Sequence, residues 1–298
     1  MIQIGVDFGG TKIEAAALDA TGAYLARTRI PNPGNYDAAI RDVRDLVTTV
    51  ERAAGAVGTV GIGMPGSISP RTGLMRNANS TYLNGRSFRE DLQLALGREL
   101  RLANDANCMA LSEAVDGAAA GARVAFAVII GTGVGGGLVI DGQIVEGANG
   151  IGGEWGHVPL PWMTAAEYPG PACWCGHSGC LDMLISGTGL RKDHAARTGA
   201  TLDGPAIIAA ARGGDTAAVA SLDAYVSRLG RAMAMVVNIV DPDVFVLAGG
   251  MSNVTEIYPG LPEVIRAHTF GGAWEGRIVP AQWGDASGVR GAARLWAR

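Results

Sequence analysis

The stretch IQIGVDFGGTKIEAAALD, residues 2–19, contains an apolar run ending in an aspartate, a glycine-rich turn and a second apolar run. These features predict two short strands joined by a glycine turn. The pattern recurs in FAVIIGTGVGGGLVIDG, residues 126–142, whose turn lies about 120 residues after the first. We interpret the recurrence as an internal duplication, so we expect the chain to contain two similar halves.

Helices and further strands alternate along the rest of the chain. Residues 36–54 and 215–240 carry apolar side chains at helical spacing, and SGVRGAARLWA predicts a closing helix. The segment TVGIGMPGSIS predicts a strand that breaks at Pro65-Gly66, and VFVLAGGM predicts a buried strand that opens into two glycines. This alternation predicts an α/β fold.

We expect two α/β domains that divide where a predicted helix stops at a glycine. The smaller domain then spans residues 1–116 and the larger one residues 117–298. The last helix, at about 287–298, is expected to pack back on the smaller domain.

The composition favours a folded globular protein and argues against a nucleic-acid-binding or membrane protein. The chain has 298 residues, 48% hydrophobic and 17% charged, which is ample for one large or two ordinary domains. Its net charge is −4 and it has no basic run, so we expect no nucleic-acid partner. The N-terminus enters a strand-like run without a leader, and no apolar segment approaches the ~20 residues of a membrane helix. We therefore expect a cytoplasmic protein with reduced thiols and no membrane contact.

Three glycine turns are candidate phosphate sites. They are DFGGTK at Asp7–Lys12, GTGVGG at Gly131–Gly136, and Ala248–Gly250. Backbone N–H groups without a neighbouring Cβ can approach a phosphate closely. The second turn matches a dinucleotide fingerprint, but a strand follows it where that fingerprint needs a helix. Any one of them alone fits a plain hairpin turn; three in paired-strand contexts favour phosphate binding. Asp7 could hold Mg²⁺ through a water molecule.

Two short motifs are candidates for binding a substrate that carries hydroxyl groups. Asn104-Asp105 follows a predicted strand and precedes a helix, where a carboxylate can take a proton from a substrate hydroxyl. The alternative is a helix N-cap pair. Glu154 and His157 add a carboxylate and an imidazole, and such a cluster of donors and acceptors suits a polyhydroxylated ligand.

The stretch CWCGHSGC places Cys173, Cys175 and Cys180 within eight residues. Together with either His177 or His157 they make four ligands, which fits a closed structural zinc site. A thioredoxin-like C-x-x-C is absent, and three free thiols are the alternative. Cys108 stands apart on a predicted helix and is expected to be a small buried side chain.

The chain resembles the ROK family of bacterial sugar kinases and repressors over nearly its whole length. The resemblance implies an actin-like ATPase (ribonuclease H-like) fold of two duplicated domains with a cleft between them, which would close on the sugar. The matching pieces are GVDFGGTK, GIGMPGSIS, LANDANC, IIGTGVGGG, GGEWGHVPLPW, CWCGHSGC and VLAGGMSN.

The resemblance also implies roles for individual residues. Asp105 would be the general base, and His157, rather than His177, would complete the zinc site and also touch the sugar. Asp7 would serve Mg²⁺. The implied ATP and phosphate contacts are Asp7, Gly9, Gly10, Thr11, Lys12, Gly131, Thr132, Gly133, Gly249 and Gly250, and the implied sugar contacts are Asn79, Asn104, Asp105, Glu154, His157 and Asp182.

One position departs from the family pattern. The family usually has glutamate two residues after the last cysteine, where it contacts the sugar, and this chain has Asp182. The charge is kept on a side chain one methylene shorter, which leaves the choice of hexose open.

Other pieces, among them NANSTYLNG, HVPLPWM and VVNIVDPD, are most similar to the fructokinase and mannokinase branch. This similarity implies ATP-dependent phosphorylation of D-fructose at the 6-hydroxyl in a homodimer. Mannose, glucose and an N-acetylated hexosamine are the alternative acceptors. A sugar-sensing repressor of the same family is the alternative class, and it is disfavoured because the first strand leaves no room for a preceding helix-turn-helix.

Overall fold

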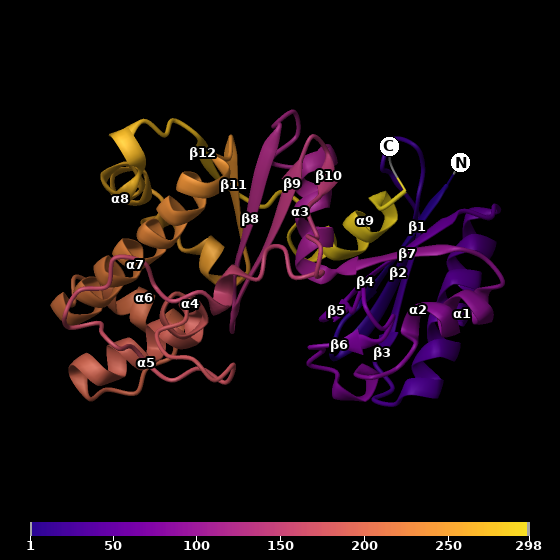
Figure 1. The fold of residues 1–298 in the computed structure, drawn as a ribbon, viewed down its shortest axis with the longest axis horizontal. Coiled ribbons are helices and arrows are strands. Elements are labelled where there is room, and N and C mark those ends of the chain that lie inside the picture. Colours follow the sequence, from indigo (N-terminus) through magenta and orange to yellow (C-terminus); the bar gives the residue numbers. More distant parts are fainter. Residues whose placement is uncertain (1, 297–298) are drawn as a thin grey trace. The chain divides into compact units, whose positions relative to one another are not determined.

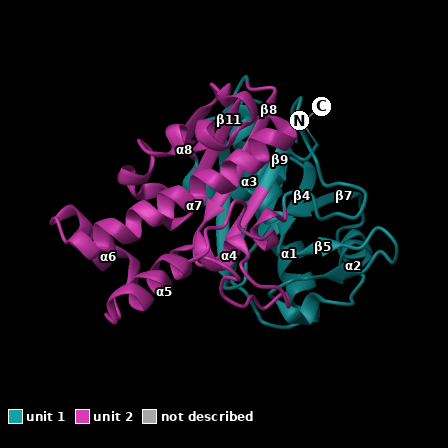
Figure 2. Cartoon of the chain, turned by 60° about the vertical axis from the view of Figure 1, so that its left-hand side comes forward, with its two compact units in different colours: residues 1–121, 137–153, 282–298 teal, residues 122–136, 154–281 magenta. Residues whose placement is uncertain are grey.

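The computed structural model describes residues 2–296, and it divides into two compact units (Figures 1 and 2). Unit 1 contains Met1–Gly121, Gly137–Gly153 and Gln282–Arg298, and unit 2 contains Ala122–Gly136 and Glu154–Ala281. The sequence predicted two continuous domains that divide at 116/117, with only the last helix packing back on the first. In the structure the chain also returns to unit 1 between residues 137 and 153.

The sheet of unit 1 begins with the hairpin predicted from residues 2–19. Strands β1 and β2 pair antiparallel, with Asp7 opposite Glu14, while β4 and β7 extend the sheet in parallel on the other side of β1. The order is β3-β2-β1-β4-β7. The strands are β1 (Gln3–Phe8), β2 (Lys12–Leu18), β3 (Tyr24–Pro31), β4 (Thr59–Met64) and β7 (Leu100–Asn104), and a separate small hairpin holds β5 (Ser67–Ile68) and β6 (Met75–Arg76).

Local signals set the bounds of helix α1 (Tyr36–Ala54), which match the predicted 36–54. The Asn35 side chain accepts a hydrogen bond from the Ala38 backbone N–H, and Gly55 ends the helix at φ 68°. Its apolar face joins the core of the unit. The other helical segments of unit 1 are η1 (Thr81–Leu83), α2 (Phe88–Leu96), α3 (Asp105–Asp116), η6 (Gly284–Ala286) and α9 (Ser287–Arg294).

Helix α9 packs against β1 and α3, and glycines make this close approach possible. A Cβ on Gly5 of β1 would lie 1.9 Å from the Val289 carbonyl oxygen, and one on Gly291 would lie 1.7 Å from the Cys108 carbonyl oxygen. Larger side chains at these positions would push the helix away. The helix was expected at about 287–298, and residues 297–298 lie outside the described part of the chain.

The second sheet repeats the order of the first, since β10-β9-β8-β11-β12 corresponds to β3-β2-β1-β4-β7. The matching order agrees with the duplication inferred from the two hairpins. In both sheets two parallel strands follow the hairpin, here β11 beside β8 and β12 beside β11. The strands are β8 (Val124–Ile130), β9 (Val134–Ile140), β10 (Gln143–Ile144), β11 (Val244–Ala248) and β12 (Arg277–Pro280).

The longest helix of unit 2 is α7 (Thr216–Val240), close to the predicted 215–240. Asp215 caps its first turn, and Asp241 ends it just before Pro242. Its buried Arg231 binds Glu167 and so anchors the loop that leads to the cysteines. The remaining helical segments are η2 (Trp155–His157), α4 (Leu181–Leu184), α5 (Gly187–Thr198), α6 (Gly204–Arg212), η3 (Gly250–Asn253), η4 (Thr255–Ile257), α8 (Leu261–His268) and η5 (Phe270–Gly272). Within residues 2–296, no helix combines the length and apolarity needed to cross a membrane.

Candidate active site

The first glycine turn follows a half-buried carboxylate, that of Asp7, near the end of β1. The Gly9 N–H donates to the Lys12 carbonyl at 3.0 Å and closes the hairpin. Burial, together with the Asp105 and Glu14 carboxylates, raises the pKa of Asp7 to about 6, and Lys12 acts in the opposite direction. This excess of negative charge in a buried place fits a cation, because a cation would restore the ionised form of Asp7.

Asn104 performs the capping role that the sequence left as an alternative. Its side-chain oxygen accepts from the Ala106 N–H at 2.9 Å, and its amide donates to the Gly66 carbonyl at 3.1 Å. The amide therefore holds the turn after β4 against the start of α3. Asp105 is the first residue of α3 and is exposed. Its Oδ1 also accepts a hydrogen bond from the Ala106 N–H, at 2.8 Å.

A cavity of about 200 Å³ in unit 1 is lined by Asn104 and by polar residues that sequence reasoning missed. These are Ser67, Arg89, Asn107 and Glu146, which come from four separate segments. Asn107 lies in the quoted LANDANC motif, which could have indicated it. Asn79 is exposed, accepts from the Ser80 N–H at 2.7 Å, and is not among the residues lining this cavity.

The second glycine turn and the glycine pair after β11 meet in unit 2. A Cβ on Gly249, whose φ is +81°, would lie 2.6 Å from the Ile130 carbonyl oxygen, so only glycine fits there. The Gly187 N–H donates to the Gly131 carbonyl at 2.8 Å and brings the start of α5 to the same place. A cavity of about 730 Å³ lies here, lined by Gly131, Thr132, Gly187, Thr188, Arg191, Asp203, Gly204, Pro205, Ile208, Arg212, Gly250, Met251, Asn253 and Val254.

This cavity has a size typical of small-molecule sites. It brings together Gly131, Thr132 and Gly250, which the sequence placed in two separate turns. Thr188 and Arg191 of α5 were missed by sequence reasoning, because nothing in the sequence near them signals a ligand.

The EWGH motif forms the short helix η2 in unit 2. Glu154 precedes it and is exposed, and His157 ends it. Between them the buried Trp155 donates from its indole N–H to the Gly135 carbonyl at 2.8 Å. The motif is therefore fixed to the strand that follows the second glycine turn.

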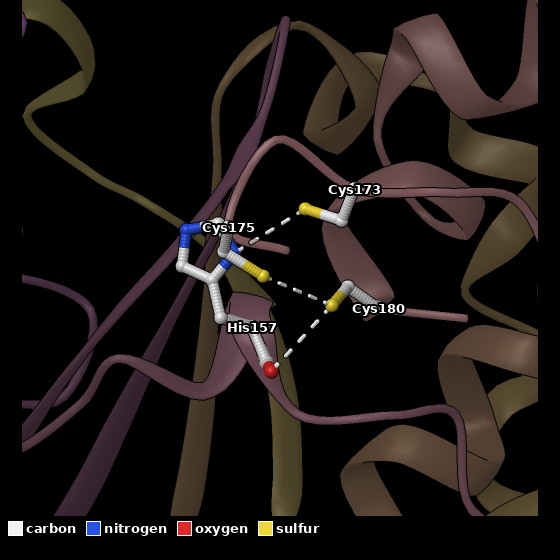
Figure 3. Close-up of side chains that lie close together, drawn as sticks. All are labelled: His157, Cys173, Cys175 and Cys180. Atoms are coloured by element: carbon white, nitrogen blue, oxygen red, sulfur yellow. Dashed lines mark hydrogen bonds between the residues drawn. The ribbon is translucent and has the colours of Figure 1, made fainter. Parts of the chain in front are cut away.

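His157, Cys173, Cys175 and Cys180 form a compact cluster (Figure 3). Their candidate ligand atoms all lie within 4.8 Å of one another. The Cys175 and Cys180 sulfur atoms are 3.6 Å apart, and Cys173 Sγ lies 3.7 Å from His157 Nδ1. Sulfur atoms on tetrahedral zinc lie about 3.8 Å apart, since each Zn–S bond is about 2.3 Å. The four side chains therefore fit a zinc ion in geometry and in chemistry.

The thiols of the cluster differ in acidity. Hydrogen bonds from the His177 backbone and side chain lower the pKa of Cys175 to about 6. Burial and the neighbouring thiols raise the pKa of Cys180 to about 12. His177 is exposed, and its Nδ1 lies 3.6 Å from Cys175 Sγ. It therefore contacts one member of the four-residue cluster without belonging to it. Cys175 is therefore the more acidic of these two thiols.

Asp182 is half-buried in helix α4 and binds the second glycine turn. Its Oδ1 accepts a hydrogen bond from the Val134 N–H at 2.7 Å. A Cβ on Gly133 would lie 2.7 Å from the same oxygen atom. Asp182 was expected to contact the sugar. In the structure one of its carboxylate oxygen atoms binds the backbone of the second glycine turn.

The sequence profile of the ROK family matches residues 3–298. The chain belongs to the ROK family. It is 40% identical to an N-acetylgalactosamine kinase of Shewanella sp. (strain ANA-3) over 294 residues, which are 98% of this chain and 95% of the relative. It is also 40% identical to an N-acetyl-D-glucosamine kinase of Pectobacterium atrosepticum over 296 residues, covering 98% of this chain and 97% of that one.

Solved structures agree with the membership of this family. A ROK hexokinase from Thermus thermophilus superposes with a TM-score of 0.87 at 32% identity, covering 99% of this chain and 97% of its own. A ROK family glucokinase from Streptomyces griseus, in complex with glucose and AMPPNP, gives a TM-score of 0.74 at 28% identity and covers 99% of both chains. These ROK kinases share the actin-like ATPase fold, which is the fold expected from the sequence.

Proposed function

We propose that this ROK protein transfers the γ-phosphoryl group of ATP to the 6-hydroxyl of a hexose. Its membership of a family whose similar members are named sugar kinases carries the proposal. The glycine-lined cavity of unit 2 and the half-buried Asp7 of unit 1 support it, because a nucleotide needs backbone donors for phosphates and a carboxylate for its cation.

The reaction assigns distinct roles to a few side chains. Asp105 takes the proton from the 6-hydroxyl as that oxygen attacks the γ-phosphorus of ATP. The bond from the γ-phosphorus to the bridging oxygen breaks, and ADP leaves with that oxygen. The turns at Gly9–Lys12 and Gly131–Gly133 supply backbone N–H groups to the phosphates. Asp7 would hold Mg²⁺ through water, and the ion would neutralise charge that develops on the phosphate oxygens.

The cysteine cluster is proposed to hold a structural zinc ion. His157, Cys173, Cys175 and Cys180 offer four protein ligands, which leaves no open position for catalysis. The ion would bind the cysteine loop to η2. If His157 coordinates through Nδ1, its Nε2 stays available to a sugar hydroxyl.

The preferred acceptor is proposed to be D-fructose, on the resemblance of segments such as NANSTYLNG and HVPLPWM. An N-acetylated hexosamine is the second candidate, because the relatives named above are kinases of N-acetylgalactosamine and N-acetyl-D-glucosamine. The shorter Asp182 bears on this choice, since one of its two carboxylate oxygen atoms already accepts the Val134 N–H.

A coupled assay of ADP release with fructose, mannose, glucose, N-acetylglucosamine and N-acetylgalactosamine tests the proposal. We expect the highest kcat/KM with fructose. A higher value with either acetylated sugar would replace fructose by the second candidate. ADP release that no hexose stimulates above the rate with ATP alone would contradict the proposed function.

A further inference from the structure

The segments that carry the metal cluster also hold the second glycine turn. Cys180 immediately precedes α4, and the next residue but one is Asp182, whose carboxylate binds the Val134 N–H at 2.7 Å. The Ser186 hydroxyl donates to the Asp182 carbonyl at 2.6 Å and accepts from the Gly189 N–H, which fixes α4 to α5. The path from the cluster to the turn is thus only two residues long.

The other side of the cluster reaches the same strand. His157 ends η2, and Trp155 of η2 binds the Gly135 carbonyl at 2.8 Å. A Cβ on Gly156 would lie 2.3 Å from the Val134 carbonyl oxygen, so η2 lies directly on this strand. Val134 and Gly135 are therefore held from both sides by residues adjacent to the cluster.

We propose that Asp182 is a positioning residue for the second phosphate turn, and that the metal cluster sets nucleotide affinity through it. The inference rests on the proposed function, because it assumes that this turn binds ATP. A charged acceptor makes a stronger hydrogen bond to a backbone N–H than a neutral one does. Asp182 therefore keeps the N–H groups of Gly133 and Val134 in one arrangement before the nucleotide arrives, which lowers the cost of binding.

Calorimetric titration with AMPPNP and Mg²⁺ tests the role of Asp182 without turnover. We expect Asp182→Ala to weaken AMPPNP binding about ten-fold, the loss of one charge-assisted hydrogen bond. Asp182→Asn keeps an acceptor oxygen and should stay within about three-fold of wild type. Asp223→Ala, an exposed aspartate of α7, is the matched control and should change nothing.

A double-mutant cycle locates the effect. Gly133→Ala places a methyl group against the Asp182 carboxylate, so its cost in AMPPNP affinity should shrink in the Asp182→Ala background. Chelation of the metal from wild-type protein should weaken AMPPNP binding and leave little further effect of Asp182→Ala. The first of these two measurements uses wild-type protein alone and so needs no variant to fold.

Different results would overturn the role of Asp182 and the proposed function. An Asp182→Ala protein with unchanged AMPPNP affinity and a raised KM for the hexose would make Asp182 a sugar ligand and overturn the inference alone. Unchanged values for both ligands, or full AMPPNP affinity after chelation, would overturn it as well. Wild-type protein that binds no AMPPNP would overturn the proposed function, and the inference with it.

Discussion

The two glycine turns follow equivalent strands, yet their surroundings differ. The first contains charged residues of its own, Asp7 and Lys12, and lies near Asp105 and Glu14. The second, GTGVGG, has no charged residue, and its shape is held by Asp182 and Trp155 from outside. No cluster comparable to that of His157, Cys173, Cys175 and Cys180 occurs among the described residues of unit 1.

This difference indicates a division of labour between duplicated parts. Unit 1 concentrates negative charge at its turn, which suits a cation and proton transfer. Unit 2 has a wide cavity lined by glycines, and its second turn is held by residues that neighbour the cluster of His157 and three cysteines. The same strand-turn-strand arrangement therefore lies among carboxylates in one unit and is held by side chains from other segments in the other. Substitutions of the carboxylates around the first turn should therefore differ in effect from substitutions of the residues that hold the second.

The largest expected effect is on turnover, in unit 1. Asp105→Ala removes the proposed general base and should lower kcat about a thousand-fold, within the range for such a group. AMPPNP affinity should stay within two-fold, because the second turn is intact. Coupled ADP release and calorimetric titration measure the two quantities, with the exposed Asp45→Ala as control. Substantial residual turnover would remove Asp105 from the mechanism.

The next effect is on stability, in unit 2. Metal analysis should find about one zinc ion per chain, and chelation should lower Tm by about 5–10 °C, because the cysteine loop would lose its ligand-bound form. Cys180→Ser should abolish metal binding, whereas Cys108→Ala, which alters the remote cysteine, should retain it. Active, unchelated protein without zinc would refute the structural site.

The Asp7 carboxyl group should make stability depend on pH. Its folded pKa of about 6 exceeds its ordinary 3.8, so the folded state binds the proton more tightly and stability falls as pH rises from about 4 to 6. Asp7→Asn should remove this loss. It should gain about 2–3 kcal/mol over wild type between pH 4 and pH 7.5, while kinase activity is lost.

Urea denaturation without nucleotide or Mg²⁺ at the two pH values measures this difference. A constant difference between the variants across that range would show that Asp7 titrates normally and would weaken its assignment to the cation.

The smallest effects are expected from alanine substitutions at two glycines where the added methyl group meets no other part of the protein. Among the described residues, no atom outside the chain neighbours lies within 4 Å of a Cβ built on Gly10 or Gly131. Alanine at either position should leave Tm within about 1 °C and weaken AMPPNP about ten-fold, because the methyl group blocks approach of a phosphate. Gly213→Ala at the end of α6 is the control. If either variant bound AMPPNP as tightly as wild-type protein does, the turn that carries it would be excluded from phosphate contact.

Much of the fold could be predicted because local signals agree with one another. The duplicated hairpins predicted the two equivalent sheets, and the caps at Asn35 and Asp215 fixed the bounds of long helices. The discontinuous units could not be predicted, because the return of residues 137–153 to unit 1 depends on packing between distant segments.

The candidate site was predictable where ligand types crowd together in sequence. The cysteine cluster and the glycine turns are such places. Arg89, Glu146 and Thr188 were missed because each stands alone in sequence and joins its cavity only in the folded chain. The sequence showed that Asp182 is one methylene shorter than the usual glutamate. It could not show the hydrogen bond to Val134, because the two residues are 48 positions apart.

If the chain transfers the γ-phosphoryl group of ATP to the 6-hydroxyl of a hexose, the products are ADP and a hexose 6-phosphate. Phosphorus NMR of a completed reaction with ATP, Mg²⁺ and the hexose that gives the highest kcat/KM tests it directly. We expect ADP and one phosphomonoester whose phosphorus couples to two methylene protons that proton–carbon correlation assigns to carbon 6, and not to the methylene carbon 1 of fructose. A phosphate on another carbon, or inorganic phosphate as the only product besides ADP, would contradict it.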